Sequence, residues 1–284
     1  MTKLHYIRNK DCNMKEGLKL NKGKLIAQGK TSEVFEYGQD KILKLFRKDL
    51  PEKNIENEYE VSFNLSKKMK LVPKVYDLVE VDDRKGIIYE KVNGTTMMEV
   101  ISSKPWKVKK EAQRLAELHE AIQKPVDFEL PDYKTTLKEN ISKTELLEED
   151  IKKRLYDYID ELKDDDLLCH GDFHPDNVLI TEEGEVIIDW MTASKGSRIA
   201  DIARTSVMLK FGASPVKRSA EKKIIKFVRN RFYSGYIKHY MKITGINKEQ
   251  IEEWELPIAA ARLNEWLPKS EKVDLLKFID MKMK

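Results

Sequence analysis

The stretch from Leu168 to Ile180 gathers polar and ionisable side chains between two apolar runs. Within it Asp172 and Asn177 are five residues apart, and Asp189 follows the apolar run Val186-Ile187-Ile188. A strand hairpin between them would return the chain, so that both carboxylates and the amide converge at one end of the hairpin. Carboxylate and amide oxygens are hard ligands that suit Mg²⁺, which keeps waters and takes phosphate oxygens as further ligands. The spacing therefore predicts a magnesium and phosphate site.

Phosphoryl transfer requires this set of groups. One carboxylate orients the attacking hydroxyl or accepts its proton, while a second carboxylate and an amide hold metal on the β- and γ-phosphates. The D-x-x-x-x-N spacing of Asp172 and Asn177 matches the catalytic loop of protein kinases, in which Asp is the base and Asn a metal ligand. We therefore expect Asp172 to be the catalytic residue, and Asn177 and Asp189 to bind the metal.

The full motif is longer than this spacing. The run His170-Gly171-Asp172-Phe173-His174-Pro175-Asp176-Asn177, followed by Ile187-Ile188-Asp189-Trp190, resembles the aminoglycoside phosphotransferase and choline kinase superfamily. That superfamily is a branch of the protein-kinase-like fold, and the resemblance covers about residues 20–265. It implies an α+β, two-lobed fold with a small β-rich N-lobe and a larger, mainly helical C-lobe. It also implies ATP and Mg²⁺ as cofactors.

The resemblance implies a lysine on the third strand that holds the α- and β-phosphates of the nucleotide. Lys44 fits this position, and Lys41 is its rival on the same strand. A glutamate on the following helix should pair with the lysine. Glu58 fits best, and the other candidates are Glu56 and Glu60.

Two backbone segments complete the implied nucleotide site. The loop between the first two strands, residues 27–34, has only Gly29 where protein kinases have several glycines. Gly29 would allow close approach of the backbone to phosphate, and Thr31 and Ser32 would offer hydroxyl and N–H donors. In the linker, backbone groups of Glu90 and Val92 would meet adenine.

The elements that must position these residues divide the chain into a strand-rich first third and a helical remainder. Strand patterns predict a three-stranded meander over 25–46, a hairpin formed by 75–81 and 86–92, a strand at 167–169, and a hairpin formed by 178–180 and 186–188. Helical periodicity predicts helices at 54–69, 105–123, 136–163, 198–211, 215–243 and 248–265. We expect an N-lobe of residues 1–92 and a C-lobe of residues 93–284, with a cleft between them.

Several conspicuous side chains near the motif have structural explanations. A zinc site would need more soft ligands, so His170 and His174 more simply order the loop. Cys169 lies in an apolar strand and is expected in the core. His119 lies in a helix and is expected to be structural. The resemblance implies that Asp201 bonds the backbone of the catalytic loop.

The sequence specifies the acceptor poorly. Many members of the superfamily phosphorylate amine-bearing alcohols, and acidic side chains suit such cations. The acids in the right part of the chain are Glu252, Glu253, Glu255, Glu265 and those of 139–166. They can equally be surface charge. Trp190, Trp254 and Trp266 can line a pocket for a sugar or a cation, or pack in the core.

We therefore expect an ATP-dependent phosphotransferase whose acceptor is the hydroxyl of a small molecule, foremost an aminoglycoside or related amino alcohol. One alternative is a kinase of the same fold that acts on a sugar, a homoserine-like compound or a protein hydroxyl. A second alternative is a nucleotide-sensing binding module without turnover. The joint presence of Lys44, Asp172, Asn177 and Asp189 argues against that second alternative.

Composition limits the compartment and the partners. The 284 residues are 36% charged and 40% hydrophobic, and no charge-free run approaches the ~18 residues of a membrane helix. The first residues lack an apolar signal segment, and Cys12 and Cys169 are too few for a disulfide scaffold. We expect a cytoplasmic protein with no membrane partner, present as a monomer or weak dimer.

Charge is distributed unevenly around a net value of +4. Residues 1–30 and 201–245 are basic, whereas residues 139–166 are acidic. Basic blocks can bind nucleic acid. A solvated helix face explains them more simply, because the aromatic residues between the lysines have the helical spacing of a core. We therefore expect no nucleic-acid partner.

Overall fold

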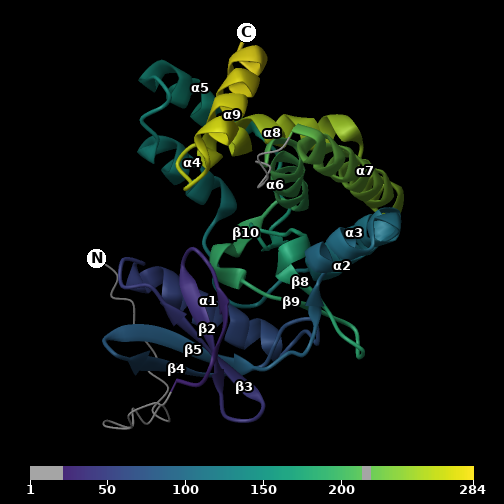
Figure 1. Ribbon diagram of the computed structural model, residues 1–284. Helices are drawn as coiled ribbons and strands as arrows, with labels where there is room; N and C mark the ends of the chain where they lie inside the picture. The colour runs from purple at the N-terminus through teal and green to yellow at the C-terminus, as the bar shows by residue number, and fades with distance from the viewer. Residues whose placement is uncertain (1–21, 213–218) are drawn as a thin grey trace, which may run out of the picture.

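The computed structural model describes residues 22–212 and 219–284 of the chain. Cys12, most of the basic N-terminal block and the first four residues of the helix expected at 215–243 lie outside the described residues. Figure 1 shows a β-sheet region at one end and a helical region at the other, joined by short strands. This arrangement confirms the expected α+β fold with a β-rich N-terminal part and a mainly helical C-terminal part.

The N-terminal part is a five-stranded antiparallel sheet of order β1-β2-β3-β5-β4. Its strands are β1 (Leu25–Gln28), β2 (Ser32–Tyr37), β3 (Lys41–Phe46), β4 (Val75–Val81) and β5 (Arg84–Glu90). Helix α1 (Glu52–Ser66) packs through Ile55 on the face that carries Phe46, Ile87 and Tyr89. The predicted meander is therefore confirmed.

The β4–β5 hairpin is tighter than its sequence suggests. Asp82 and Asp83 both have positive φ, 51° and 55°, as the two central residues of a type I′ turn require. Two residues thus suffice for the turn, and β5 begins at Arg84 instead of the predicted residue 86. Helix α1 likewise begins and ends two to three residues before the predicted 54–69, directly after Pro51.

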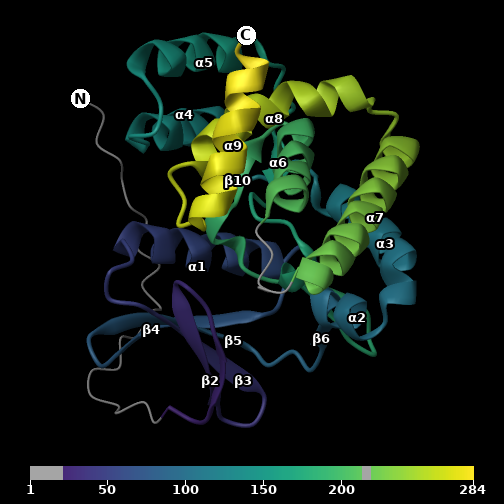
Figure 2. The ribbon, with the colours of Figure 1, turned by 45° about the horizontal axis from the view of Figure 1, so that its top comes forward.

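The C-terminal part is built mainly of helices. They are α2 (Met97–Ser103), α3 (Val108–Ile122), α4 (Tyr133–Lys143), α5 (Glu149–Glu161), α6 (Arg198–Phe211), α7 (Ser219–Thr244), α8 (Lys248–Arg262) and α9 (Lys269–Lys282). Short 3₁₀ helices are η1 (Pro105–Lys107), η2 (Pro175–Asn177) and η3 (Trp190–Thr192). Figure 2 shows α3 alongside α7, and α8 and α9 beside α4 and α5.

Two small sheets lie between the large sheet and the helices. One has the order β6 (Thr95–Thr96), β8 (Val178–Ile180), β9 (Glu185–Ile187), and the other pairs β7 (Leu167–Cys169) with β10 (Ser194–Gly196). The predicted strands at 167–169 and 178–180 are confirmed, and β9 lies one residue before its predicted place. The loop that carries Asp172 therefore runs from β7 to β8.

The single helix predicted for 136–163 is wrong. The chain leaves helical geometry at Thr144, and α5 starts again at Glu149. Leu147 in the connection is buried in the main hydrophobic cluster, and α4 packs against α5. The break coincides with a buried leucine and is marked by no glycine or proline in the sequence.

The helix predicted for 248–265 ends at Arg262 and contains Pro257. A proline inside a helix cannot donate to the carbonyl four residues earlier, here that of Glu253. The hydroxyl of Tyr158 from α5 donates to this carbonyl at 3.0 Å instead. Helix α9, which follows, is not predicted from the sequence.

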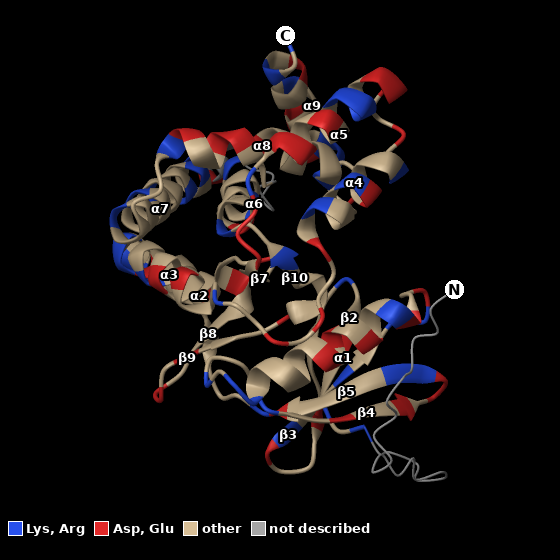
Figure 3. Ribbon diagram, turned by 180° about the vertical axis from the view of Figure 1, so that it is seen from behind, with Lys and Arg blue, Asp and Glu red and all other residues tan. Residues whose placement is uncertain are grey.

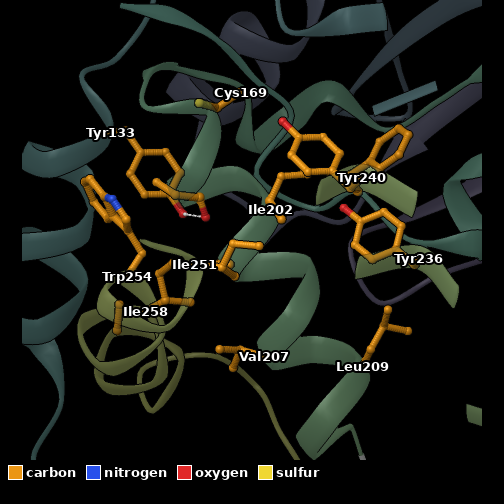
Figure 4. Packing of buried hydrophobic residues seen from close by; sticks show 14 of the residues in the cluster. Tyr133, Cys169, Ile202, Val207, Leu209, Tyr236, Tyr240, Ile251, Trp254 and Ile258 are labelled. Atoms are coloured by element: carbon orange, nitrogen blue, oxygen red, sulfur yellow. Dashed lines mark hydrogen bonds between the residues drawn. The ribbon is translucent and has the colours of Figure 1, made fainter. Parts of the chain in front are cut away.

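One large hydrophobic cluster fills the helical part and reaches α1 through Val61 and Leu65. Figure 4 shows part of it around α6, with Tyr133 and Trp254 in edge contact at 6.1 Å between ring centroids. Because α1 shares this core, the division into residues 1–92 and 93–284 stays a proposal. Within residues 22–212 and 219–284, no helix has the length and apolar character needed to cross a membrane.

Candidate active site

Lys44 on β3 is held between two carboxylates. Its Nζ lies 2.6 Å from Oε1 of Glu58 and 2.9 Å from Oδ1 of Asp189, and the side chain is 12% exposed. Burial opposes the charged form, but the two carboxylates outweigh it and hold the pKa of Lys44 above its ordinary value. Its rival Lys41 instead lies over the ring of Tyr76. Of the two lysines, the structure brings Lys44 into the cluster.

Glu58 is the glutamate of α1 that faces this lysine. Its side chain is 1% exposed, and Oε1 also accepts from the hydroxyl of Tyr89 at 3.0 Å. Glu56 and Glu60 are exposed. The helix thus presents one of its three candidate glutamates to the site, on the stripe that also buries Ser62.

Asp172 lies in the loop after β7, next to a glycine that the conformation requires. Gly171 has φ +75°, and a Cβ there would lie 2.4 Å from the carbonyl oxygen of Thr192. The carboxylate of Asp172 lies 3.4 Å from Nε2 of His174. Burial would raise the pKa of Asp172, but His174 and the Arg204 guanidinium hold it well below its usual range. Asp172 is therefore ionised at neutral pH.

Asn177 ends η2 and is aimed by its own hydrogen bonds. Its Nδ2 donates to the backbone oxygen of Asp172 at 2.9 Å, which leaves the amide oxygen available. The N–H of Ile188 donates to the Asn177 carbonyl at 3.0 Å and so brings the following residue, Asp189, alongside. Asp189 has φ +66°, a left-handed conformation that Asp tolerates better than most residues.

The oxygens of Asn177 and Asp189 suit an open Mg²⁺ site, in which phosphates and waters are the other ligands, better than a site enclosed by protein ligands. Asp189 gives only Oδ1 to Lys44, so both residues retain an oxygen. The described part of the chain holds no group of three or more His, Cys, Asp or Glu that could bind a metal. Mg²⁺ is commonly bound by one or two protein oxygens and completed by phosphates and waters. His170, the first residue of the motif, forms a hydrogen bond through Nε2 to the carbonyl of Ile188 at 3.1 Å.

Side chains of helix α6 form hydrogen bonds to the backbone of the loop that carries Asp172. Asp201 accepts the N–H of His170 at 2.7 Å and of Gly171 at 2.9 Å, and Thr205 donates to the carbonyl of Phe173 at 2.8 Å. Asp201 also accepts from Nε2 of the buried His119 at 2.9 Å. The bonds of Asp201 to the loop backbone are those that the resemblance implies, and His119 is buried, as a structural residue would be.

The loop of the predicted phosphate site turns between β1 and β2. The N–H of Gly29 donates to the carbonyl of Ser32 at 2.8 Å, and Ser32 is buried at the start of β2. A Cβ on Gly29 would meet nothing nearer than 3.7 Å, so the protein itself leaves room there. Arg47, which the sequence did not single out, donates to the carbonyls of Lys30 and Gly29 at 2.9 and 3.1 Å. The roles of Gly29, Thr31 and Ser32 toward phosphate stay predictions.

The linker after β5 borders an open, polar hollow of about 640 Å³. It is lined by Val92 to Thr95 and by Ile180 to Glu182. The N–H of Glu90 donates to the carbonyl of Lys74 at 2.8 Å. Adenine contacts of Glu90 and Val92 stay predictions.

Three of the acids considered for the acceptor pair with basic side chains of the protein itself. Glu255 is buried against Lys210, Glu252 pairs with Lys248, and Glu265 pairs with two arginines. Figure 3 shows Lys and Arg spread along α7 and acidic segments on α8. Trp190 and Trp254 are core residues, whereas Trp266 is 74% exposed.

The site combines two features. A lysine of the β-sheet contacts a glutamate and an aspartate, and a loop with an aspartate and an asparagine lies beside them. This combination is typical of kinase-like phosphotransferases. The family model described as the phosphotransferase enzyme family matches residues 22–225. The chain therefore belongs to this phosphotransferase enzyme family, which confirms the resemblance read from the sequence and the expectation of an enzyme. The comparison with curated protein sequences gave no match.

Solved structures show the same fold at low sequence identity. The aminoglycoside phosphotransferase APH(4)-Ia is 14% identical, with a TM-score of 0.61 over 91% of this chain and 90% of that one. The choline kinase from Cryptosporidium parvum Iowa II is 15% identical, with a TM-score of 0.53 over 92% and 88%. The streptomycin–ATP complex of APH(2″)-IIa is 14% identical, with a TM-score of 0.55 over 93% and 92%. At these identities the likeness establishes the fold.

Proposed function

We propose that this protein transfers the γ-phosphoryl group of ATP to a hydroxyl of a small molecule, with an aminoglycoside or related amino alcohol as the first acceptor to test. The observation that carries the proposal is the cluster in which Lys44 contacts both Glu58 and Asp189, with the Asp172 and Asn177 loop beside it. The β-sheet and the helical part both contribute residues to this site. A reaction between a nucleotide and an acceptor requires such a shared site, because both molecules must be bound next to each other.

In this proposal each residue has a defined role. Lys44, positioned by Glu58, binds the α- and β-phosphates, and the Gly29 loop with Thr31 and Ser32 covers them. Backbone groups of Glu90 and Val92 bind adenine. Asn177 and Asp189 hold Mg²⁺, which when bound neutralises charge on the phosphates. Asp172 receives the acceptor hydroxyl.

The basicity of Asp172 defines what this carboxylate can do. A carboxylate is a far weaker base than the alkoxide that would form, so it removes little of the hydroxyl proton before the P–O bond has formed. Asp172 therefore accepts a hydrogen bond that orients the hydroxyl, and takes the proton as the oxygen becomes acidic on bonding to phosphorus. Catalysis then rests on positioning and charge neutralisation, as in related phosphoryl transfers.

The acceptor class remains the open part of the proposal. Related folds include enzymes whose names specify aminoglycosides and choline, which favours an amine-bearing alcohol. Glu255 and Glu265 are already neutralised by Lys210, Arg204 and Arg262, which favours a neutral acceptor such as a sugar or a homoserine-like compound as the second candidate.

A screen for acceptor-dependent ADP release tests the proposal. Purified protein with ATP and Mg²⁺ is assayed against aminoglycosides, amino alcohols, sugars and homoserine, with an acceptor-free reaction as baseline. We expect at least one class to raise ADP release well above baseline. ATP binding with no release above baseline for any class would instead support the nucleotide-sensing module.

A further inference from the structure

We infer that Arg204 is a positioning residue for this reaction, which fixes the peptide between Gly171 and Asp172 and ties it to the segment 263–268 through Glu265. The inference rests on the proposed function for its catalytic consequence. The contacts on which it is built do not depend on that function.

Arg204 lies on α6 with its side chain 16% exposed. Its Nε donates to the carbonyl of Gly171, and NH1 lies 2.9 Å from Oε1 of Glu265. The carbonyl of Gly171 belongs to the peptide that leads into Asp172. The direction of this carbonyl therefore fixes the plane of the peptide from which the Asp172 side chain departs.

The conformation of Gly171 explains why this peptide needs hydrogen bonds to fix its orientation. Its left-handed φ of +75° is accessible to glycine because glycine lacks a Cβ, but glycine also has many other conformations available. Asp201 fixes the N–H of Gly171 from one side at 2.9 Å. Arg204, one helical turn further along α6, fixes the carbonyl. The two side chains together restrict the backbone conformation of this glycine.

The other end of Arg204 reaches the segment between α8 and α9. Glu265 also pairs with Arg262 at 3.1 Å, so this carboxylate is held from two sides. The next residue, Trp266, accepts a hydrogen bond from Nζ of Lys30 at 3.1 Å through its carbonyl oxygen. Segment 263–268 thus contacts the phosphate loop through Lys30 and the catalytic loop through Arg204.

An arginine suits this position because of its shape. The planar guanidinium presents several N–H donors in a fixed fork, so it can bond a carbonyl and a carboxylate in different directions at once. A lysine would offer the same charge as a point and without the fork. A purely structural ion pair with Glu265, by contrast, would need only a buried positive charge, which a lysine would also supply.

Lys210 supplies a matched control on the same helix. Its Nζ lies 2.6 Å from Oε1 of Glu255 on α8, so it also joins α6 to the C-terminal helices through an ion pair. No hydrogen bond links Lys210 to residues 170–177 in the described part of the chain. Lys210→Met therefore removes a comparable ion pair and leaves the catalytic loop in place.

The experiment compares Arg204→Met, Arg204→Lys and Lys210→Met in the full-length protein. Steady-state kinetics with the acceptor found by screening give kcat and the KM for ATP, and thermal unfolding gives Tm. We expect Arg204→Met to lower kcat by about 10²-fold with little change in the KM for ATP, the size of loss that misplacement by an ångström can cause. Lys210→Met should keep kcat close to that of the unaltered protein even where Tm falls, and Arg204→Lys should restore Tm more than kcat.

Hydrogen exchange provides a readout that does not need turnover. Arg204→Met should speed exchange of the amides of residues 170–173, whereas Lys210→Met should not. If no acceptor is phosphorylated but exchange changes in this way, the proposed function fails, whereas the fixing of the Gly171–Asp172 peptide by Arg204 stands. Equal effects of Arg204→Met and Lys210→Met on kcat and on loop exchange would overturn the inference. If Arg204→Met does not fold, Arg204→Lys decides, because a positioning role requires it to lower kcat at near-normal Tm.

Discussion

The ionisable side chains of the candidate site lie in contact with one another. Lys44 lies between Glu58 and Asp189, and Asp172 lies near His174. The two carboxylates hold the pKa of Lys44 above its ordinary value and so keep the lysine cationic in a partly buried site. In the function that we propose, this cation and the neighbouring oxygens are already in place when the nucleotide binds.

Removal of the Glu58 charge should impair the nucleotide site and leave the fold intact. In Glu58→Gln the amide keeps the shape, but Lys44 loses the stronger of its two carboxylate contacts. A charge-assisted hydrogen bond contributes about 1.5–3 kcal/mol. We expect kcat/KM for ATP to fall by about 10-fold or more, measured by ADP release. Glu56→Gln, an exposed change on the same helix, should be silent, and equal effects of the two variants would refute the role of Glu58.

Two glycines of the site should respond to alanine in opposite ways. Gly29 has room for a Cβ, so Gly29→Ala should change stability by less than about 0.5 kcal/mol and raise the KM for ATP. Gly171 has a left-handed φ and a backbone atom in the path of a Cβ, so Gly171→Ala should cost at least about 1–2 kcal/mol of stability. Urea unfolding and ATP kinetics measure both. An unchanged KM in Gly29→Ala would contradict a phosphate-covering role.

At this scale the motif spacing predicted Asp172, Asn177 and Asp189, and the family resemblance predicted Lys44 and Glu58. Lys44, Glu58 and Asp189 form one cluster, and Asn177 bonds the backbone of Asp172. Arg204 could not be predicted in the same way. Nothing near it in the sequence indicates which basic residue of the helix turns inward, because that depends on where Gly171 and Glu265 lie in space.

Helix α6 is the element that shapes the catalytic loop. Asp201, Arg204 and Thr205 bond the backbone of residues 170–173 from one face of the helix. Figure 4 shows how the other side of the same helix is packed, with Ile202 and Val207 inside the cluster. The helix that bonds the loop is therefore itself anchored in the core.

The stability that Asp201 provides should depend on pH. Burial would raise the pKa of Asp201, but His119 and the backbone N–H donors hold it below its ordinary value. A carboxyl with a lowered folded pKa stabilises the fold above its unfolded pKa of about 3.9, and this stabilisation is lost as pH falls through the lower folded value. Asp201→Asn should therefore be less stable by about 1.5–3 kcal/mol or more at pH 7, and the gap should narrow below about pH 4. Urea unfolding at several pH values measures the gap, and a constant gap would contradict an ionised Asp201.

The elements themselves were predicted with uneven success. Strand alternation predicted the meander, and the helix at 198–211 has the predicted bounds. The break between α4 and α5 has no glycine or proline to mark it, and the buried Leu147 of the connection belongs to the main cluster, so no local pattern reveals it. The helix predicted for 248–265 does run through Pro257, and it ends three residues early, at Arg262.

At the scale of the whole molecule, side chains join the sheet to the helical part across the site. Lys44 bonds Asp189, and Lys30 bonds the carbonyl of Trp266. α1 also packs against η3 and shares the main core. A nucleotide bound between the two parts should therefore stabilise the molecule as a unit.

Nucleotide should raise the melting temperature in a manner that depends on Mg²⁺. A ligand at 100 times its Kd stabilises the native state by about 2.7 kcal/mol. We expect AMP-PNP with Mg²⁺ to raise Tm by several degrees, and EDTA to remove much of this increase. Asp189→Asn should lose the Mg²⁺-dependent part, whereas Asp176→Asn, a change at a neighbouring turn acid, should retain it. Identical responses of both variants would rule out Asp189 as a metal ligand.

The acceptor, the cytoplasmic location and the monomeric or weakly dimeric state are whole-molecule properties that the sequence leaves as predictions. The acceptor is the clearest case. The acids that seemed free in the sequence, such as Glu255 and Glu265, are paired in the structure.

Transfer of labelled phosphate to an acceptor is the most direct test of phosphoryl transfer at Asp172. The protein is incubated with γ-labelled ATP, Mg²⁺ and the acceptor found by screening, and Asp172→Ala is run beside it at matched ATP occupancy. We predict that the label enters the acceptor with the unaltered protein, and that Asp172→Ala binds ATP comparably but transfers about 10²–10⁴-fold more slowly. Undiminished transfer by Asp172→Ala, or label that never reaches any acceptor despite bound ATP, would contradict the account.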